Sequence, residues 1–158
     1  GTNRKLEYDY KINKFPSDQI NGSDRIIQFL PYPGNYGFIP STLLDRQRGG
    51  DGDALDVIVL SESTPSGSVL EIIPIALLKL EDNGESDNKV IAIPASKERR
   101  IVNATSYEEL VSDYPGITDI IKLWFTSYKG ESIVKFIGWE DEILAQQELD
   151  KWTILSDK

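Results

Sequence analysis

Three aspartates within six residues are the side chains in this sequence best suited to do chemistry. Asp51, Asp53 and Asp56 lie on a turn loosened by Gly52, and the apolar run 57–60 follows at once. A short β-branched run bounded by turn residues indicates a buried strand. Like charges this close shift one another's pKa values unless a cation or ligand compensates them. Because hard divalent cations such as Mg²⁺ prefer oxygen ligands, the pattern predicts a metal-assisted site that works on phosphate.

The composition narrows the chemistry further. The chain has no histidine, which excludes Ser-His-Asp catalysis, imidazole bases and most zinc or copper sites. It has no cysteine, so nothing depends on redox state. A formal net charge of −9 argues against nucleic acid and anionic membranes, which attract Lys and Arg. An anionic small substrate stays compatible with this charge if metal ions reverse the local sign.

The length of 158 residues fits a single domain, residues 1–158, with its own hydrophobic core. No apolar run is long enough to span a bilayer and no segment has the h-region of a signal peptide, so we expect a cytoplasmic protein. The chain also lacks methionine and so has no initiator residue, and we expect that it was processed, was cut or has a start that lies upstream of Gly1. An exported, processed form is therefore the alternative.

Two other interpretations compete for the aspartate cluster. Aspartates that cap backbone amides in a turn would explain one or two of them well, but three in six residues poorly. An EF-hand calcium loop would place Asp51 and Asp53 at its first and third positions. However, Leu55 then stands at a ligand position, Asp56 replaces the required glycine, and no helices flank the loop. We reject the calcium loop.

A phosphoryl-transfer site needs three classes of side chain, and the chain offers all of them. Carboxylates hold metal ions, one carboxylate stays available to deprotonate water, and basic and phenolic groups bind the phosphate charge. The candidate carboxylates are Asp51, Asp53, Asp56, Asp82, Asp87 and Glu7; the candidate cations are Lys5, Arg25, Lys89 and Lys129; and the candidate phenols are Tyr32, Tyr36 and Tyr128.

The elements that must position these groups are mostly short strands. Strict alternation predicts a half-buried strand over 5–10, and Asn21-Gly22 is a hairpin signal that precedes another strand over 23–27. Residues 31–40 are rich in Pro and Gly and indicate a rigid loop. Pro74 divides or bends the apolar stretch 69–80. Further strands are predicted over 57–60, 90–93 and 133–137, with an acidic hairpin loop over 81–89.

The last third of the sequence turns helical. Ser106 and Glu109 have capping-box spacing for a short helix, and Pro115 suits the first turn of a second helix that Gly130 ends. A third helix is predicted over 140–149. The packing face of the second helix is predicted to hold Ile117, Ile120, Ile121, Trp124, Phe125 and Tyr128. The sequence thus predicts a β-rich α+β fold, a small closed β-barrel with helices on its outside.

The stretch Asp51-Gly-Asp-Ala-Leu-Asp56-Val resembles D-G-D-P-[LIV]-D-V, the signature of the family I (soluble) inorganic pyrophosphatases. The resemblance covers most of the chain, and its pieces follow the order of the family. The other pieces are Lys5-x-Glu7, Asp24-Arg25, Tyr32-Pro-x-Asn-Tyr36-Gly, Asp82-x4-Asp87-x-Lys89, Tyr128-Lys129 and Gly138-Trp139-Glu140.

The resemblance implies a five-stranded OB-like barrel that hydrolyses pyrophosphate to two orthophosphates, with several Mg²⁺ ions (or Mn²⁺ or other divalent ions) and with water activated by the metal. Matching positions make Asp51, Asp56 and Asp87 ligands of a first ion, with Asp56 shared to a second. Asp82 and Asp87 match ligands of a third, and Glu7 reaches an ion through water. Asp53 matches the general base. The matching phosphate ligands are Lys5, Arg25, Tyr36, Lys89, Tyr128 and Lys129, and Tyr32 lines the site.

The sequence departs from the family pattern in three places. Ala54 replaces the signature proline, the segment from Arg25 to Tyr32 is one residue short, and a glutamate of the family's preceding strand has no counterpart, so we expect that strand upstream of Gly1. By analogy with soluble bacterial relatives we expect a homo-oligomer such as a hexamer. The alternative function is a catalytically silent OB-like module that binds an anion or a metal.

Overall fold

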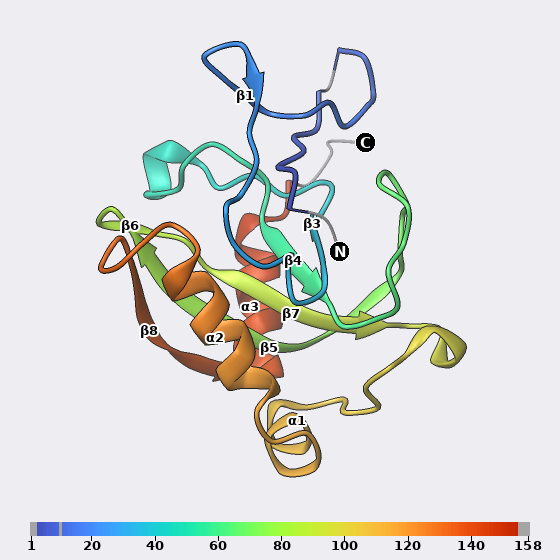
Figure 1. Cartoon of the computed structure of the whole chain (residues 1–158). Coiled ribbons are helices and arrows are strands. Elements are labelled where there is room, and N and C mark those ends of the chain that lie inside the picture. Colours follow the sequence, from blue (N-terminus) through green and yellow to red (C-terminus); the bar gives the residue numbers. More distant parts are fainter. Residues whose placement is uncertain (1–2, 10, 155–158) are drawn as a thin grey trace.

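A six-stranded mixed sheet forms the centre of the molecule (Figure 1). The computed structural model describes residues 3–9 and 11–154. The strand order is β3-β4-β7-β5-β6, with β8 also paired to β5. The strands are β3 (Asn35–Phe38), β4 (Asp56–Val59), β5 (Ile72–Asp82), β6 (Glu85–Ser86), β7 (Lys89–Pro94) and β8 (Val134–Asp141), with β1 (Gln19–Ile20) and β2 (Ser23–Asp24) in a separate hairpin.

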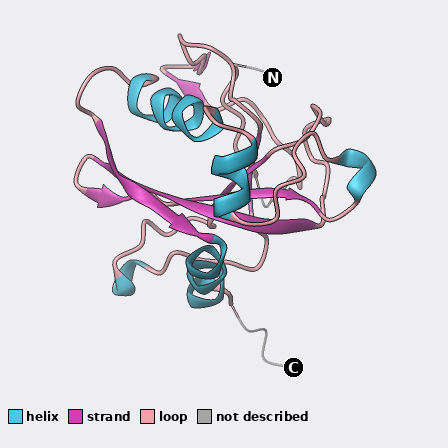
Figure 2. Cartoon of the chain, turned by 90° about the horizontal axis from the view of Figure 1, so that it is seen from below, coloured by secondary structure: helices cyan, strands magenta, loops and turns pink. Residues whose placement is uncertain are grey.

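Helices cover both faces of this sheet (Figure 2). The helices α1 (Tyr107–Asp113) and α2 (Ile117–Ser127) pack on one face, and α3 (Glu142–Trp152) packs on the other. Short 3₁₀ turns lie at Arg46–Arg48 and Lys97–Arg99. Side chains of β4 alternate between the two cores, so Ile58 faces α2 while Val57 and Val59 face α3. The parallel pair β4 and β7 is buried on both faces, which explains its nearly unbroken apolar sequence.

Several predicted elements are confirmed. Asn21 and Gly22 both have positive φ, at 54° and 78°, in the tight turn between β1 and β2. The strand β5 is one strand with a register shift between Pro74 and Ala76, so the predicted bend is present. The hydroxyl of Ser106 accepts from the Glu109 N–H at the start of α1.

Other predictions near the N-terminus are wrong. Residues 5–9 form only isolated bridges, Leu6 with Ser17 and Asp9 with Lys14, and Tyr10 lies outside the described residues. The strand predicted over 23–27 shrinks to β2. The predicted loop 31–40 contains β3, which pairs antiparallel with β4. The Pro- and Gly-rich composition of residues 31–40 favoured a loop over a strand. However, Gly34, directly before β3, is needed for close packing, because a Cβ there would lie 2.8 Å from Ile58 Cγ2.

The predicted packing face of α2 is only partly correct. Ile121, Trp124 and Phe125 are buried, whereas Ile120 is 61% exposed and lies on the outer side with Leu123. The apolar face of an amphipathic helix covers only part of its circumference, and Ile120 lies outside the part of α2 that packs on the sheet.

The sheet is open in the described part of the chain. β3 stands at one end of the strand order, and β6 and β8 both pair with β5 at the other. In the described chain before β3, the isolated bridges and the β1–β2 hairpin pair this segment with itself, so it supplies no ladder to the main sheet that would close a barrel. A β-rich α+β fold with flanking helices is confirmed; closure into a barrel is not. Within the described ranges, no helix has the length and apolar character needed to cross a membrane.

Candidate active site

A lysine held between two aspartates forms the centre of the candidate site. Asp56 begins β4 and Lys89 begins β7, and the parallel register places the two residues directly opposite each other. The Lys89 Nζ lies 2.5 Å from a carboxylate oxygen of Asp56 and 2.5 Å from one of Asp87. Burial acts to lower the pKa of Lys89, but the two carboxylates outweigh it and raise the pKa above its ordinary value. The ammonium is therefore charged at neutral pH.

Two stacked tyrosines cover this centre. The Tyr36 hydroxyl donates to Asp56 Oδ2 at 2.6 Å, and the ring of Tyr32 stacks on the ring of Tyr36 with centroids 4.6 Å apart. Burial and the charge of Asp56 raise the pKa of Tyr36 well above its ordinary value, so its phenol stays a hydrogen-bond donor. Burial also raises the pKa of Tyr32, and the nearby Tyr128 and Asp56 raise it further by smaller amounts. Both rings thus face the acidic centre.

The aspartate turn presents a third carboxylate to the same region. The Asp53 N–H donates to Asp51 Oδ1 at 2.9 Å, and Arg46 Nε donates to the Asp51 backbone oxygen at 2.9 Å. Asp51 is thus partly a turn former. The pKa of Asp53 is raised, first by burial and then by the negative charges of Asp51, Asp56 and Glu7. Three predicted carboxylates from the N-terminal segment, the turn and β4 therefore lie near enough to Asp53 to act on it.

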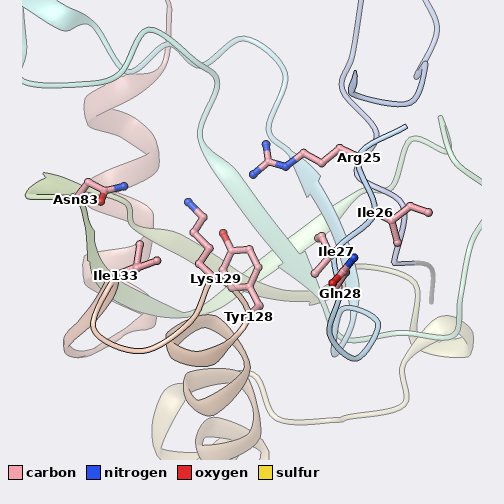
Figure 3. Close-up of a pocket in the computed structure, with 8 residues that line it drawn as sticks. All are labelled: Arg25, Ile26, Ile27, Gln28, Asn83, Tyr128, Lys129 and Ile133. Atoms are coloured by element: carbon pink, nitrogen blue, oxygen red, sulfur yellow. The ribbon is translucent and has the colours of Figure 1, made fainter. Parts of the chain in front are cut away.

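A hollow of about 510 Å³ adjoins this region (Figure 3). The Arg25 guanidinium, the Tyr128 hydroxyl and the Lys129 ammonium point into it. Lys129 forms an ion pair with Asp82 at the end of β5. Burial raises the pKa of Tyr128 to about 12, and Asp87 is its next largest cause. Three predicted phosphate ligands therefore line one hollow beside two predicted metal ligands.

The N-terminal segment adds two cations that share an anchor. Asp18 forms ion pairs with Arg25 at 3.1 Å and with Lys5 at 3.9 Å, and Lys5 also pairs with Glu7 at 2.9 Å. Sequence analysis missed Asp18 because it stands in an irregular segment with no motif around it. It also missed Asn83, which lines the hollow from the turn after β5. Asn83 has a positive φ of 51°, and the only sequence feature that indicated this tight turn was the glycine that follows it, Gly84.

The carboxylates suit a hard cation, but lysines hold them at present. Lys89 bridges Asp56 and Asp87, and Lys129 holds Asp82. In the described ranges, no three acidic side chains already form a group that could hold a metal ion. The pKa of Asp53 is raised first by burial and then by the negative charge of Asp51, Asp56 and Glu7, so negative charge still gathers around this carboxyl. A donor set made of oxygen atoms with excess negative charge fits Mg²⁺ or a similar ion.

Comparison with known proteins identifies the family. The family described as inorganic pyrophosphatase matches residues 1–155. This chain belongs to the inorganic pyrophosphatase family. The inorganic pyrophosphatase of Haloferax volcanii is 37% identical over 155 residues, which cover 95% of this chain and 79% of that protein. The inorganic pyrophosphatase of Thermus thermophilus is 35% identical over 94% of this chain and 81% of its own length.

Solved pyrophosphatase structures have the same fold. The inorganic pyrophosphatase of Coxiella burnetii matches with a TM-score of 0.78 at 32% identity, covering 96% of this chain and 86% of that one. A Trypanosoma cruzi vacuolar soluble pyrophosphatase, solved in complex with PPi, matches with a TM-score of 0.85 at 26% identity and covers 96% and 63% of the two chains. The predicted family is confirmed, and with it the class of enzyme, an inorganic diphosphatase.

Proposed function

We propose that this pyrophosphatase hydrolyses inorganic pyrophosphate to two orthophosphates in a reaction that depends on Mg²⁺. The observation that carries this proposal is the meeting of two oppositely charged groups of side chains. The carboxylates of Asp56 and Asp87 lie in contact with Lys89, beside a hollow lined by Arg25 and Lys129. Carboxylates attract cations and the cationic side chains attract phosphate, so the site can gather a metal–pyrophosphate complex.

The metal ligands in this proposal are Asp51, Asp56, Asp82, Asp87 and Glu7. Bound divalent cations would lower the pKa of coordinated water and neutralise phosphate charge. The five side chains come from separate segments, and the Glu7, Asp51 and Asp56 charges already act together on Asp53. The all-oxygen donor set suits a hard divalent ion such as Mg²⁺ or Mn²⁺, and the family resemblance supports Mg²⁺.

Asp53 is the proposed general base. Its backbone is fixed by the bond from its N–H to Asp51 and by the bond from the Leu44 N–H to its own carbonyl, so its carboxylate is held at the edge of the acidic group. It takes a proton from the attacking water as the water oxygen bonds to one phosphorus atom. The bridging P–O bond then breaks, and its electron pair leaves with the departing phosphate. A carboxylate whose pKa lies above its ordinary value is a stronger base for this step.

The proposed phosphate ligands still have hydrogen-bonding capacity to offer. An ammonium has three N–H donors. Lys89 uses two of them on Asp56 and Asp87, and Lys129 uses one on Asp82. Each therefore retains at least one donor for a phosphate oxygen. The full proposed set is Lys5, Arg25, Tyr36, Lys89, Tyr128 and Lys129, with Tyr32 supporting Tyr36.

The decisive experiment measures phosphate release from pyrophosphate with and without Mg²⁺. We expect release only with the metal. The matched control is Asp119→Asn, an exposed α2 carboxylate that pairs only weakly with Lys122 and lies outside the proposed site, and it should keep full activity. If the protein binds phosphate but releases none from pyrophosphate, the alternative of a catalytically silent anion- or metal-binding module replaces the enzymatic mechanism.

Three further features belong to the proposal. We propose that residues 1–158 act as one cytoplasmic domain, that five of its strands belong to an OB-like barrel, and that the chain assembles into a homo-oligomer such as a hexamer. Exposed apolar side chains on α2, Ile120 at 61% and Leu123 at 64%, support assembly. Light scattering after size-exclusion chromatography tests it, because a monomeric mass would contradict the oligomer.

A further inference from the structure

Four aromatic rings form a continuous column beside the candidate site. Tyr36 stacks on Tyr32 with centroids 4.6 Å apart, Tyr32 meets Trp124 at 4.4 Å, and Trp124 stacks on Tyr128 at 4.6 Å. The planes of Trp124 and Tyr128 are within 13° of parallel. Three of these rings are tyrosines with hydroxyl groups for the site. Trp124 has no such group, and the proposed mechanism gives it no role.

The two ends of the column are the parts that do chemistry. At one end the Tyr36 hydroxyl donates to Asp56 Oδ2. At the other, the Tyr128 hydroxyl points into the hollow next to the Lys129 ammonium (Figure 3). The column therefore spans from the lysine-centred carboxylates to the cationic hollow.

Trp124 ties the column to both of its supports. Its side chain is 4% exposed and leaves α2 one turn before Tyr128. Its indole Nε1 donates to the Leu30 carbonyl at 2.9 Å, two residues before Tyr32. The neighbouring Phe125 packs edge-on against both Trp124 and Tyr128. The indole thus fixes the distance between the end of α2 and the segment that carries Tyr32 and Tyr36.

We infer that Trp124 is a positioning residue for pyrophosphate hydrolysis: it sets the separation of the Tyr36 and Tyr128 hydroxyls and so fixes where the two phosphate groups bind. This inference rests on the proposed function. A ring that only fills the core would affect stability. A ring that sets the distance between two substrate ligands affects turnover, because a displacement of about 1 Å in such a site costs on the order of 100-fold in rate.

Two substitutions of Trp124 separate these roles. Trp124→Leu removes the ring from the column, and we expect kcat/KM to fall by about 100-fold, mainly through kcat. Trp124→Phe keeps a ring between Tyr32 and Tyr128 but loses the bond to Leu30. We expect it to recover activity to within about fivefold of wild type, the factor associated with one ordinary hydrogen bond.

The matched control is Ile121→Ala, on the same helix. Ile121 is 1% exposed and stands outside the ring column, so this variant should lose stability but keep kcat/KM when assayed well below its melting temperature. If Trp124→Leu lowers kcat/KM no more than Ile121→Ala does, Trp124 only fills the core and the inference is overturned.

A fluorescence measurement tests the column without relying on turnover or on the folding of Trp124→Leu. Trp139 packs on Tyr107, and the ring of Trp152 contacts the cationic groups of Arg48 and Lys151, so neither belongs to the column. In the double variant Trp139→Phe/Trp152→Phe, the emission of Trp124 should change saturably as inorganic phosphate is added with Mg²⁺. A flat titration in a protein that binds phosphate by calorimetry would refute the inference, whereas an inactive wild type would refute only the proposed function.

Discussion

Replacing Lys89 by methionine tests whether the centre of the site is held together by charge. Methionine keeps most of the length of the side chain but leaves Asp56 and Asp87 facing each other without a cation. Removing one partner of a fully buried ion pair costs about 3 to 5 kcal/mol. The lysine side chain is 4% exposed, but the aspartates are 29% and 24% exposed, and water therefore solvates part of their charge. We expect a loss of about 2 to 3 kcal/mol in the free energy of unfolding.

Urea denaturation in EDTA and in saturating Mg²⁺ provides the assay. In EDTA the full loss should appear. With Mg²⁺ a bound ion replaces the missing charge and stabilises the folded form by mass action, so about half of the loss or more should be recovered. The control is Lys79→Met, which breaks the half-exposed pair with Glu140 and should cost at most about 1 kcal/mol with or without metal. A loss of the same size in both buffers, or one no larger than that of Lys79→Met, would refute the reasoning.

Three further predictions concern the metal, the base and an anchor. EDTA should lower the melting temperature and Mg²⁺ should raise it, as measured by calorimetry; an unchanged value would count against clustered carboxylates. Asp53→Asn should abolish most turnover yet raise the melting temperature of the metal-free protein, because the folded state raises the pKa of Asp53 and so disfavours its charged form. This gain in stability should be absent below pH 3.8, the ordinary pKa, and should grow as pH rises through the raised pKa of the folded state. Wild-type turnover in Asp53→Asn would remove Asp53 from the base role. Asp18→Asn should raise KM more than it lowers kcat, because Asp18 holds Lys5 and Arg25 in place, and steady-state kinetics with an unchanged KM would contradict this.

The sequence revealed the parts of the fold that local rules control. Asn21-Gly22 predicted its turn because both positions need positive φ, and Ser106 predicted the start of α1 because its hydroxyl caps the helix. The strand β3 was missed because this edge strand contains Gly37 and follows Gly34, which is needed for close packing against Ile58. Barrel closure depends on contacts between distant segments, which no local pattern specifies.

The same division holds for the site. The motif around Asp51, Asp53 and Asp56 was visible because its residues are adjacent in sequence. The bridge from Lys89 to Asp56 spans 33 positions and depends on strand register, so the sequence did not predict it. The family resemblance assigned both residues to the site, but as a phosphate ligand and a metal ligand. Asp18 and Trp124 act through other side chains, and nothing in their spacing distinguishes them from ordinary surface and core residues.

The parallel pairing of β4 with β7 has a consequence for how the enzyme folds. Asp56 and Lys89 meet only when two strands distant in the chain have found their correct register, and such non-local pairing is slow compared with helix formation. A collapsed intermediate with its helices in place would have no functional centre. In a refolding experiment, the return of hydrolysis would therefore mark completion of the central ladder, later than the return of helical circular dichroism.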